Sequence, residues 1–126
     1  MKLNIDCVRE ILLTIEKLGY EEQLNFDMLH ERIPAYSKED LHYCLIKLDE
    51  ANLLDIITVP VVRQHLPGIK SIHYLTVSGH EFLENVKSDK VWNRTKSVAS
   101  KVGSFSLDTL KDISVKVISE LIKTSL

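Results

Sequence analysis

The chain has 126 residues, a formal net charge of −2, and contents of 44% hydrophobic and 27% charged residues. This length supports one domain with a single modest core, and the composition excludes wholesale disorder. The near-neutral charge gives no whole-chain sign of a nucleic-acid partner. The opening segment mixes charges with apolar residues at helical spacing, and no later run reaches membrane-spanning length. We therefore expect a cytoplasmic protein with no signal peptide and no membrane span.

Three helices are predicted in the first half of the chain. Apolar residues at three- and four-residue spacing mark the first, which ends before Gly19. A short second helix follows and is stopped by Pro34. Ser37 is expected to cap the third helix, which ends near Ala51 with Asn52 as a left-handed cap residue. The expected buried stripe of this third helix consists of Leu41, Cys44, Leu45 and Leu48.

A β-hairpin is predicted next. Residues 53–66 and 69–75 are rich in β-branched residues, and the turn pair Pro67 and Gly68 separates them. Pro60 lies inside the first run, which predicts an edge position, a bulge, or a strand that starts after it.

Three more helices are predicted after the hairpin. Thr76 can cap the first of them, and Gly79 in its first turn indicates close backbone packing. Residues 89–102 form the next and are closed by Gly103, and residues 106–126 form the last.

This order of elements is that of a winged helix-turn-helix with additional C-terminal helices. Three helices lead into a hairpin, and a further helix returns the chain to the core. The predicted fold class is therefore α+β, mostly α. We expect a winged-helix domain at residues 1–88 and a two-helix extension at residues 89–126, packed on the same domain.

Four segments carry a resemblance to a known family: "REILLTIEK", "YSKEDLHYCLIKLDEANLL", "LTVSGHEFLENVKSDKVWNRTK" and "GSFSLDTLKDISVKVISELI". The chain resembles a family of short bacterial and prophage proteins catalogued as a domain of unknown function. The resemblance covers nearly the whole chain and is most specific from Leu75 to Trp92. It implies a winged-helix-like fold and a frequent phage or mobile-element context, and it implies no activity. Cys44 stands where the family often has histidine, which puts a polar role there in doubt, and Asn52 replaces a frequent glycine.

A winged helix suggests DNA binding, with the third helix in the major groove and the hairpin beside the backbone. Ile46 on the third helix could meet a thymine methyl group. The other candidate contacts are polar side chains of the third helix and of the hairpin: Lys38, His42, Tyr43, Lys47, Arg63, Gln64, His65 and Lys70. The leading hypothesis is a small DNA-binding transcriptional regulator of phage or mobile-element type.

The distribution of charge argues against this hypothesis. Residues 1–53 hold six basic and eleven acidic side chains, whereas a DNA-binding protein concentrates positive charge where it docks. Glu39 and Asp40 would lie at the helix end that approaches the duplex, although they also suit the start of a helix. The alternative hypothesis is a non-enzymatic protein-interaction module that kept the fold without binding DNA.

Two C-terminal features could serve such an interaction. Residues 87–101 hold five basic side chains and one acidic one around Trp92, and Lys90, Arg94 and Lys96 are the candidate partner contacts. A helix that buries Trp92 and leaves its lysines in water explains the same pattern. The last helix has a broad apolar stripe, which could complete the core of its own chain or form a homodimer.

Catalytic, cofactor and metal sites are not indicated. The sequence has no CxxC, no HExxH and no phosphate-binding glycine loop. His42 and Cys44 are two residues apart and would point to different sides of a helix. Serine and histidine show no spacing that suggests an activated nucleophile, so we expect a protein that is not an enzyme. Cys7 and Cys44 are expected to be small buried hydrophobes in a reducing compartment, and a disulfide between them is neither required nor excluded.

Overall fold

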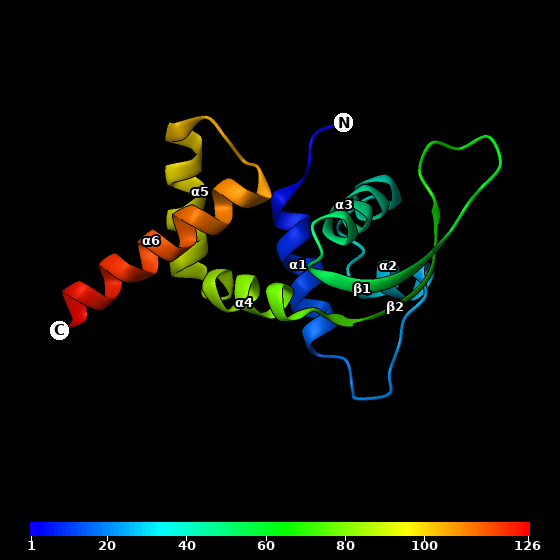
Figure 1. Cartoon of the computed structure of the whole chain (residues 1–126), viewed down its shortest axis with the longest axis horizontal. Helices are drawn as coiled ribbons and strands as arrows, with labels where there is room; N and C mark the ends of the chain where they lie inside the picture. The colour runs from blue at the N-terminus through cyan, green and yellow to red at the C-terminus, as the bar shows by residue number, and fades with distance from the viewer. The chain divides into compact units, whose positions relative to one another are not determined.

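The computed structural model describes residues 1–126 and shows an α+β chain that is mostly helical (Figure 1). This confirms the predicted class, while the assignment to the winged-helix fold stays a prediction. The elements in chain order are α1 (Ile5–Glu16), α2 (Phe26–Arg32), α3 (Lys38–Glu50), β1 (Leu54–Val59), β2 (Gly68–Leu75), α4 (Val77–Val86), α5 (Asp89–Val102) and α6 (Leu107–Ser125).

The predicted helix caps are confirmed. The Ser37 hydroxyl accepts a hydrogen bond from the Asp40 N–H at 3.1 Å, and Thr76 Oγ1 accepts one from the Gly79 N–H at 3.1 Å. Gly103 ends α5 with φ of 83°, and Asn52 has φ of 58°. Both values lie in the left-handed region that ends a helix, which glycine and asparagine adopt at low cost.

Strands β1 and β2 form an antiparallel hairpin with two irregularities. Asp55 pairs with Tyr74 and Ile56 pairs with Ile72, so His73 is an extra residue on β2. Ile57 pairs with Ser71 and Thr58 pairs with Ile69, so Lys70 is a second extra residue on β2. Two residues against one define a β-bulge, which bends the strand and redirects side chains.

The edges of the hairpin differ from the expected strand limits. Strand β1 ends at Val59, directly before Pro60, whereas the predicted β-rich segment extends to residue 66. Proline has no N–H to donate to a partner strand, so the ladder stops there. On the other side of β2, Leu24 and Ile72 exchange two backbone hydrogen bonds, of 3.0 and 2.7 Å. Strand β2 therefore has a partner on both sides at this position.

The chain divides into two compact units, Met1–His80 and Glu81–Leu126. In the first unit, α1 packs against α3 and β2. All three elements contribute fully buried side chains to the core of this unit. In the second unit, α5 packs against α6 and buries Trp92, Ala99 and Leu110. The proposed division into residues 1–88 and 89–126 stays a prediction. No helix is long and apolar enough to cross a bilayer.

Gly79 lies where α4 meets the backbone that follows α3. A Cβ built on Gly79 would overlap the carbonyl oxygen of Leu53 and lie 2.9 Å from its carbonyl carbon. The same oxygen accepts a hydrogen bond from the Thr76 N–H at 3.2 Å. The close packing predicted from the glycine is therefore confirmed, and only glycine fits this position.

Cys7 and Cys44 are free thiols, fully buried where α1 meets α3. Two effects raise the pKa of the Cys7 thiol above its ordinary value. The larger is a hydrogen bond with Cys44, and the second is burial. Burial keeps this side chain in its neutral form. The expectation that both cysteines act as small buried hydrophobes is confirmed.

Candidate binding surface of the third helix and the hairpin

The outer face of α3 is narrower than the sequence pattern predicts. Lys38 is exposed and His42, Tyr43 and Lys47 are half-buried. Ile46, expected to face a DNA groove, is only 4% exposed, so this expectation is wrong. Helix α3 packs against α2 and β1 as well as α1, so its buried side extends beyond the stripe predicted from periodicity.

The lysines of α3 are paired with carboxylates. Lys38 Nζ lies 3.8 Å from Asp27 Oδ1, and Lys47 Nζ lies 3.0 Å from Glu50 Oε2. The hydrogen bond to Glu50 raises the pKa of Lys47, which also lies 5.3 Å from the centre of the Tyr43 ring. These contacts compensate the positive charge of the face that was predicted to meet phosphate groups.

His42 connects α3 to the hairpin. Its Nε2 donates a hydrogen bond of 2.7 Å to the carbonyl oxygen of Pro67, at the end of the loop between the strands. Its ring also meets the Phe26 ring edge-on, with centroids 6.0 Å apart. His42 was predicted to contact DNA, and the structure gives it a role in positioning the loop.

We expect His42→Ala to lower the free energy of unfolding by about 1–2 kcal/mol, because it leaves the Pro67 carbonyl without its partner and removes the ring contact. Urea unfolding followed by circular dichroism measures this change. Trypsin should also cleave after Arg63 faster than in the wild type. His30→Ala, on a half-buried residue of α2, is the control, and equal effects from both variants would contradict the role assigned to His42.

The loop between the strands carries the other predicted contacts. Arg63, Gln64 and His65 are exposed there, and Lys70 is exposed on β2. Arg63 adopts φ of 63°, a left-handed conformation at the tip of the loop. Four apolar side chains of the hairpin are exposed beside them, by 38% to 87%: Ile57, Val59, Val61 and Val62. The hairpin therefore presents a mixed basic and apolar surface.

The candidate partner contacts of α5 border a small hollow. Lys90 and Arg94 line it together with the α6 residues Val117, Glu120, Leu121 and Thr124, and its volume is about 300 Å³. Lys96 Nζ instead lies 5.7 Å from the centre of the Trp92 ring. Trp92 is 3% exposed, so the expectation that it belongs to the core is confirmed.

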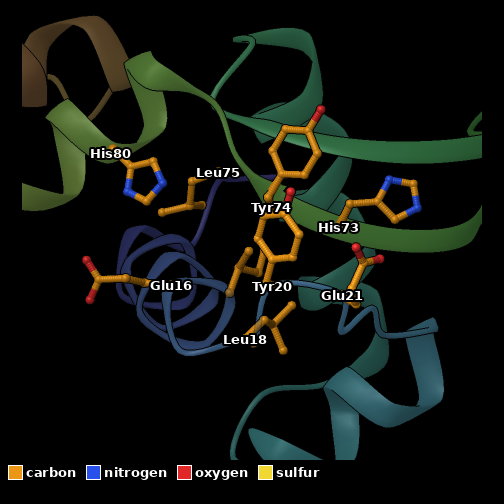
Figure 2. A pocket seen from close by; sticks show the side chains of 10 residues that line it. Glu16, Leu18, Tyr20, Glu21, His73, Tyr74, Leu75 and His80 are labelled. Atoms are coloured by element: carbon orange, nitrogen blue, oxygen red, sulfur yellow. The ribbon is translucent and has the colours of Figure 1, made fainter.

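A cleft of about 530 Å³ opens between the end of α1 and strand β2 (Figure 2). Ile15 and Leu75 contribute apolar surface, and two tyrosines, Tyr20 and Tyr74, lie in the centre of the view. Glu16, Glu21, His73 and His80 complete the polar lining. No group of three or more His, Cys, Asp or Glu side chains in the chain is arranged to hold a metal ion.

A hydrogen-bonded chain of three side chains lies on the hairpin. Ser71 Oγ is 2.8 Å from His73 Nε2, and His73 Nδ1 is 2.8 Å from Asp55 Oδ2. This cluster was not predicted from the sequence. A serine and a histidine two residues apart on a strand share one face, which was a usable signal. The aspartate comes from the paired strand, and only the register reveals it.

Comparison with known proteins identifies the family. Residues 2–106 match the family described as "Hypothetical protein (DUF2513)", and the chain belongs to this family. A Haemophilus influenzae protein described as uncharacterised is 29% identical over 123 residues, which cover 97% of this chain and 99% of that protein. No solved structure matches the chain. The resemblance to a family of unknown function, predicted from the sequence, is confirmed.

Proposed function

We propose that this protein is a small DNA-binding regulator that contacts duplex DNA through the hairpin loop, with α3 beside it. The observation that carries the proposal is that α3 and the hairpin loop are held together. His42 on α3 donates a 2.7 Å hydrogen bond to the carbonyl oxygen of Pro67 in the loop. Three helices followed by a hairpin agree with a winged helix, and so does the Leu24–Ile72 pairing beside β2. The regulatory role in a phage or mobile element rests on the family resemblance.

The distribution of ion pairs supports phosphate contacts at the hairpin rather than at α3. Lys38 and Lys47 already have carboxylate partners. Arg63 and Lys70 are exposed, and no ion pair is found for either. A side-chain cation without a carboxylate partner gains more binding free energy from a phosphate group, because it gives up no existing ion pair. The proposal therefore places the main electrostatic contact at the hairpin and a smaller one at α3.

Binding to a random-sequence duplex, followed by fluorescence anisotropy across about 50–200 mM salt, tests this assignment. We expect Arg63→Gln with Lys70→Gln to reduce the slope of log K against log salt by about 2, because two phosphate contacts are lost. The control, Lys116→Gln with Lys123→Gln, makes the same change in net charge at exposed positions of α6. Absence of binding at low salt, or equal slopes for both double variants, would contradict the proposal.

A protein-interaction module is the second candidate function, and the exposed apolar side chains of the hairpin favour it. Val62 is 87% exposed beside Val59 and Val61, which is more apolar surface than a phosphate contact requires. The hollow bordered by Lys90 and Arg94 gives this candidate a second surface. Capture of a protein partner that is lost in Val61→Ser with Val62→Ser, by a wild-type protein that does not bind duplex DNA, would support this function over the first.

A homodimer through α6 is part of the first proposal, because a two-fold protein matches a palindromic DNA site. Its support is the apolar surface that α6 leaves uncovered: Val115 is 53% exposed and Ile122 is 56% exposed. In such a dimer, the two copies of α3 would lie about 34 Å apart to meet successive major grooves.

A further inference from the structure

The hydrogen-bonded chain Ser71–His73–Asp55 has a defined direction. An ionised carboxylate only accepts hydrogen bonds, so His73 Nδ1 must carry the hydrogen that is shared with Asp55 Oδ2. In the neutral imidazole, Nε2 is then left without a hydrogen. It accepts the hydroxyl hydrogen of Ser71 across 2.8 Å. A serine hydroxyl therefore donates to a histidine whose tautomer is fixed by an aspartate.

The bulge in β2 explains how these residues meet. Asp55 pairs with Tyr74, and His73 is the extra residue beside it. Side chains alternate strictly along a regular strand, and a bulge interrupts the alternation and redirects one of them. In Figure 2, the imidazole of His73 points away from Tyr20, and its ring centre lies 6.4 Å from that of Tyr74. This orientation agrees with its bonds to Ser71 and Asp55.

Water and small molecules can reach the three side chains. The His73 side chain is 22% exposed, the Asp55 side chain is 43% exposed, and Ser71 is half-buried. The imidazole is thus sheltered enough to keep its orientation, and Ser71 is not fully covered by protein. A nucleophile, a base and a group that orients the base, each within hydrogen-bond reach of the next, form the arrangement used for acyl transfer on unrelated folds.

We propose that Ser71 is an activated nucleophile that accepts acyl groups from small carboxylic esters, with His73 as general base and Asp55 as a positioning residue. This activity is separate from the proposed DNA binding and does not depend on it. The cluster lies open on the hairpin, so it suits small esters with a good leaving group.

The reaction balances without a cofactor. Ser71 Oγ forms a bond to the ester carbonyl carbon while His73 Nε2 takes the hydroxyl proton. The bond between that carbon and the leaving oxygen breaks, and the imidazolium returns the proton to the departing alcohol. Water then attacks the acyl-serine with His73 again as base. This step releases the carboxylic acid and restores the Ser71 hydroxyl.

Labelling of the full-length protein with a fluorophosphonate probe, followed by peptide mass spectrometry, tests the proposal. We expect one modified serine, Ser71, and no labelling of Ser97, an exposed serine of α5. His73→Gln should slow the modification of Ser71 by roughly 100-fold or more, the size of a general-base contribution. Hydrolysis of p-nitrophenyl acetate should fall in parallel, and Ser97→Ala should change neither rate.

Asp55 needs a measurement that separates positioning from folding. Asp55→Asn can stabilise the other tautomer of His73, so the rate of Ser71 labelling should fall while the circular dichroism spectrum stays that of the wild type. Asp55→Glu should restore part of the rate. If Ser71 reacts no faster than Ser97 in the folded wild type, the proposal is overturned. Labelling of Ser71 that is unaffected by His73→Gln and by Asp55→Asn overturns it as well.

Discussion

Gly79→Ala is expected to lower the free energy of unfolding by roughly 3 kcal/mol or more, at the upper end of the cost of overpacking. The added Cβ would overlap the carbonyl oxygen of Leu53, which is backbone and cannot rotate away. Relief requires α4 to move from the end of α3, and this movement breaks the hydrogen bond from the Thr76 N–H to Leu53. Urea unfolding followed by far-ultraviolet circular dichroism gives the difference.

Gly19→Ala provides the matched control for this prediction. The nearest atom to a Cβ on Gly19 is Glu22 Cβ at 3.8 Å, an ordinary contact distance. This variant should unfold within about 0.5 kcal/mol of the wild type, because it adds a methyl group without displacing an atom. A Gly79→Ala protein as stable as Gly19→Ala would show that α4 does not pack as closely as the structure indicates.

Trp92→Ala is expected to destabilise the second unit by about 3–5 kcal/mol, the usual cost of removing a large buried aromatic side chain. Trp92 is 3% exposed and belongs to the contact between α5 and α6. The variant removes the only tryptophan of the chain, so unfolding must be followed by circular dichroism rather than by fluorescence.

Asn93→Ala changes the neighbouring, exposed position of α5 and should leave stability within about 0.5 kcal/mol of the wild type. The comparison decides whether the tryptophan is a core residue or an exposed anchor for a partner. A loss below about 1 kcal/mol for Trp92→Ala would reopen its assignment to a partner-binding surface.

The elements that sequence analysis located correctly depend on local signals. The hydroxyls of Ser37, Thr76 and Ser106 each accept a hydrogen bond from an N–H three residues later, so short segments contain the whole cap. The left-handed residues Asn52 and Gly103 mark helix ends for the same reason. Helical periodicity then places the apolar stripes, because it depends only on spacing along the chain.

The candidate site depends on contacts between distant segments, which spacing does not reveal. Periodicity predicted that Ile46 would lie on the exposed face of α3, but packing against other elements buries it. Lys38 gained its carboxylate partner from α2, eleven residues away in sequence. The bond from His42 to Pro67 spans 25 residues. Each of these contacts changes which side chains remain available to a ligand.

The serine–histidine–aspartate cluster shows the same limit most clearly. Alternation along a regular strand would place His73 and Tyr74 on opposite faces of the hairpin. The bulge removes this alternation, and its position follows from how β1 and β2 align as a pair. Composition and spacing do not determine that register, so the contact between His73 and Asp55 could not be predicted from the sequence.

The packing of α1 against both α3 and β2 has a consequence for synthesis of the chain on the ribosome. Helix α1 is complete at Glu16, whereas β2 ends at Leu75, roughly 60 residues or 3–12 seconds later at ordinary translation rates. Until then, the apolar face of α1 lacks one of the surfaces that cover it. Helices α5 and α6 are neighbours in sequence and can pair soon after they emerge. Translational pausing before Leu75 therefore lengthens the time during which this face of α1 is exposed.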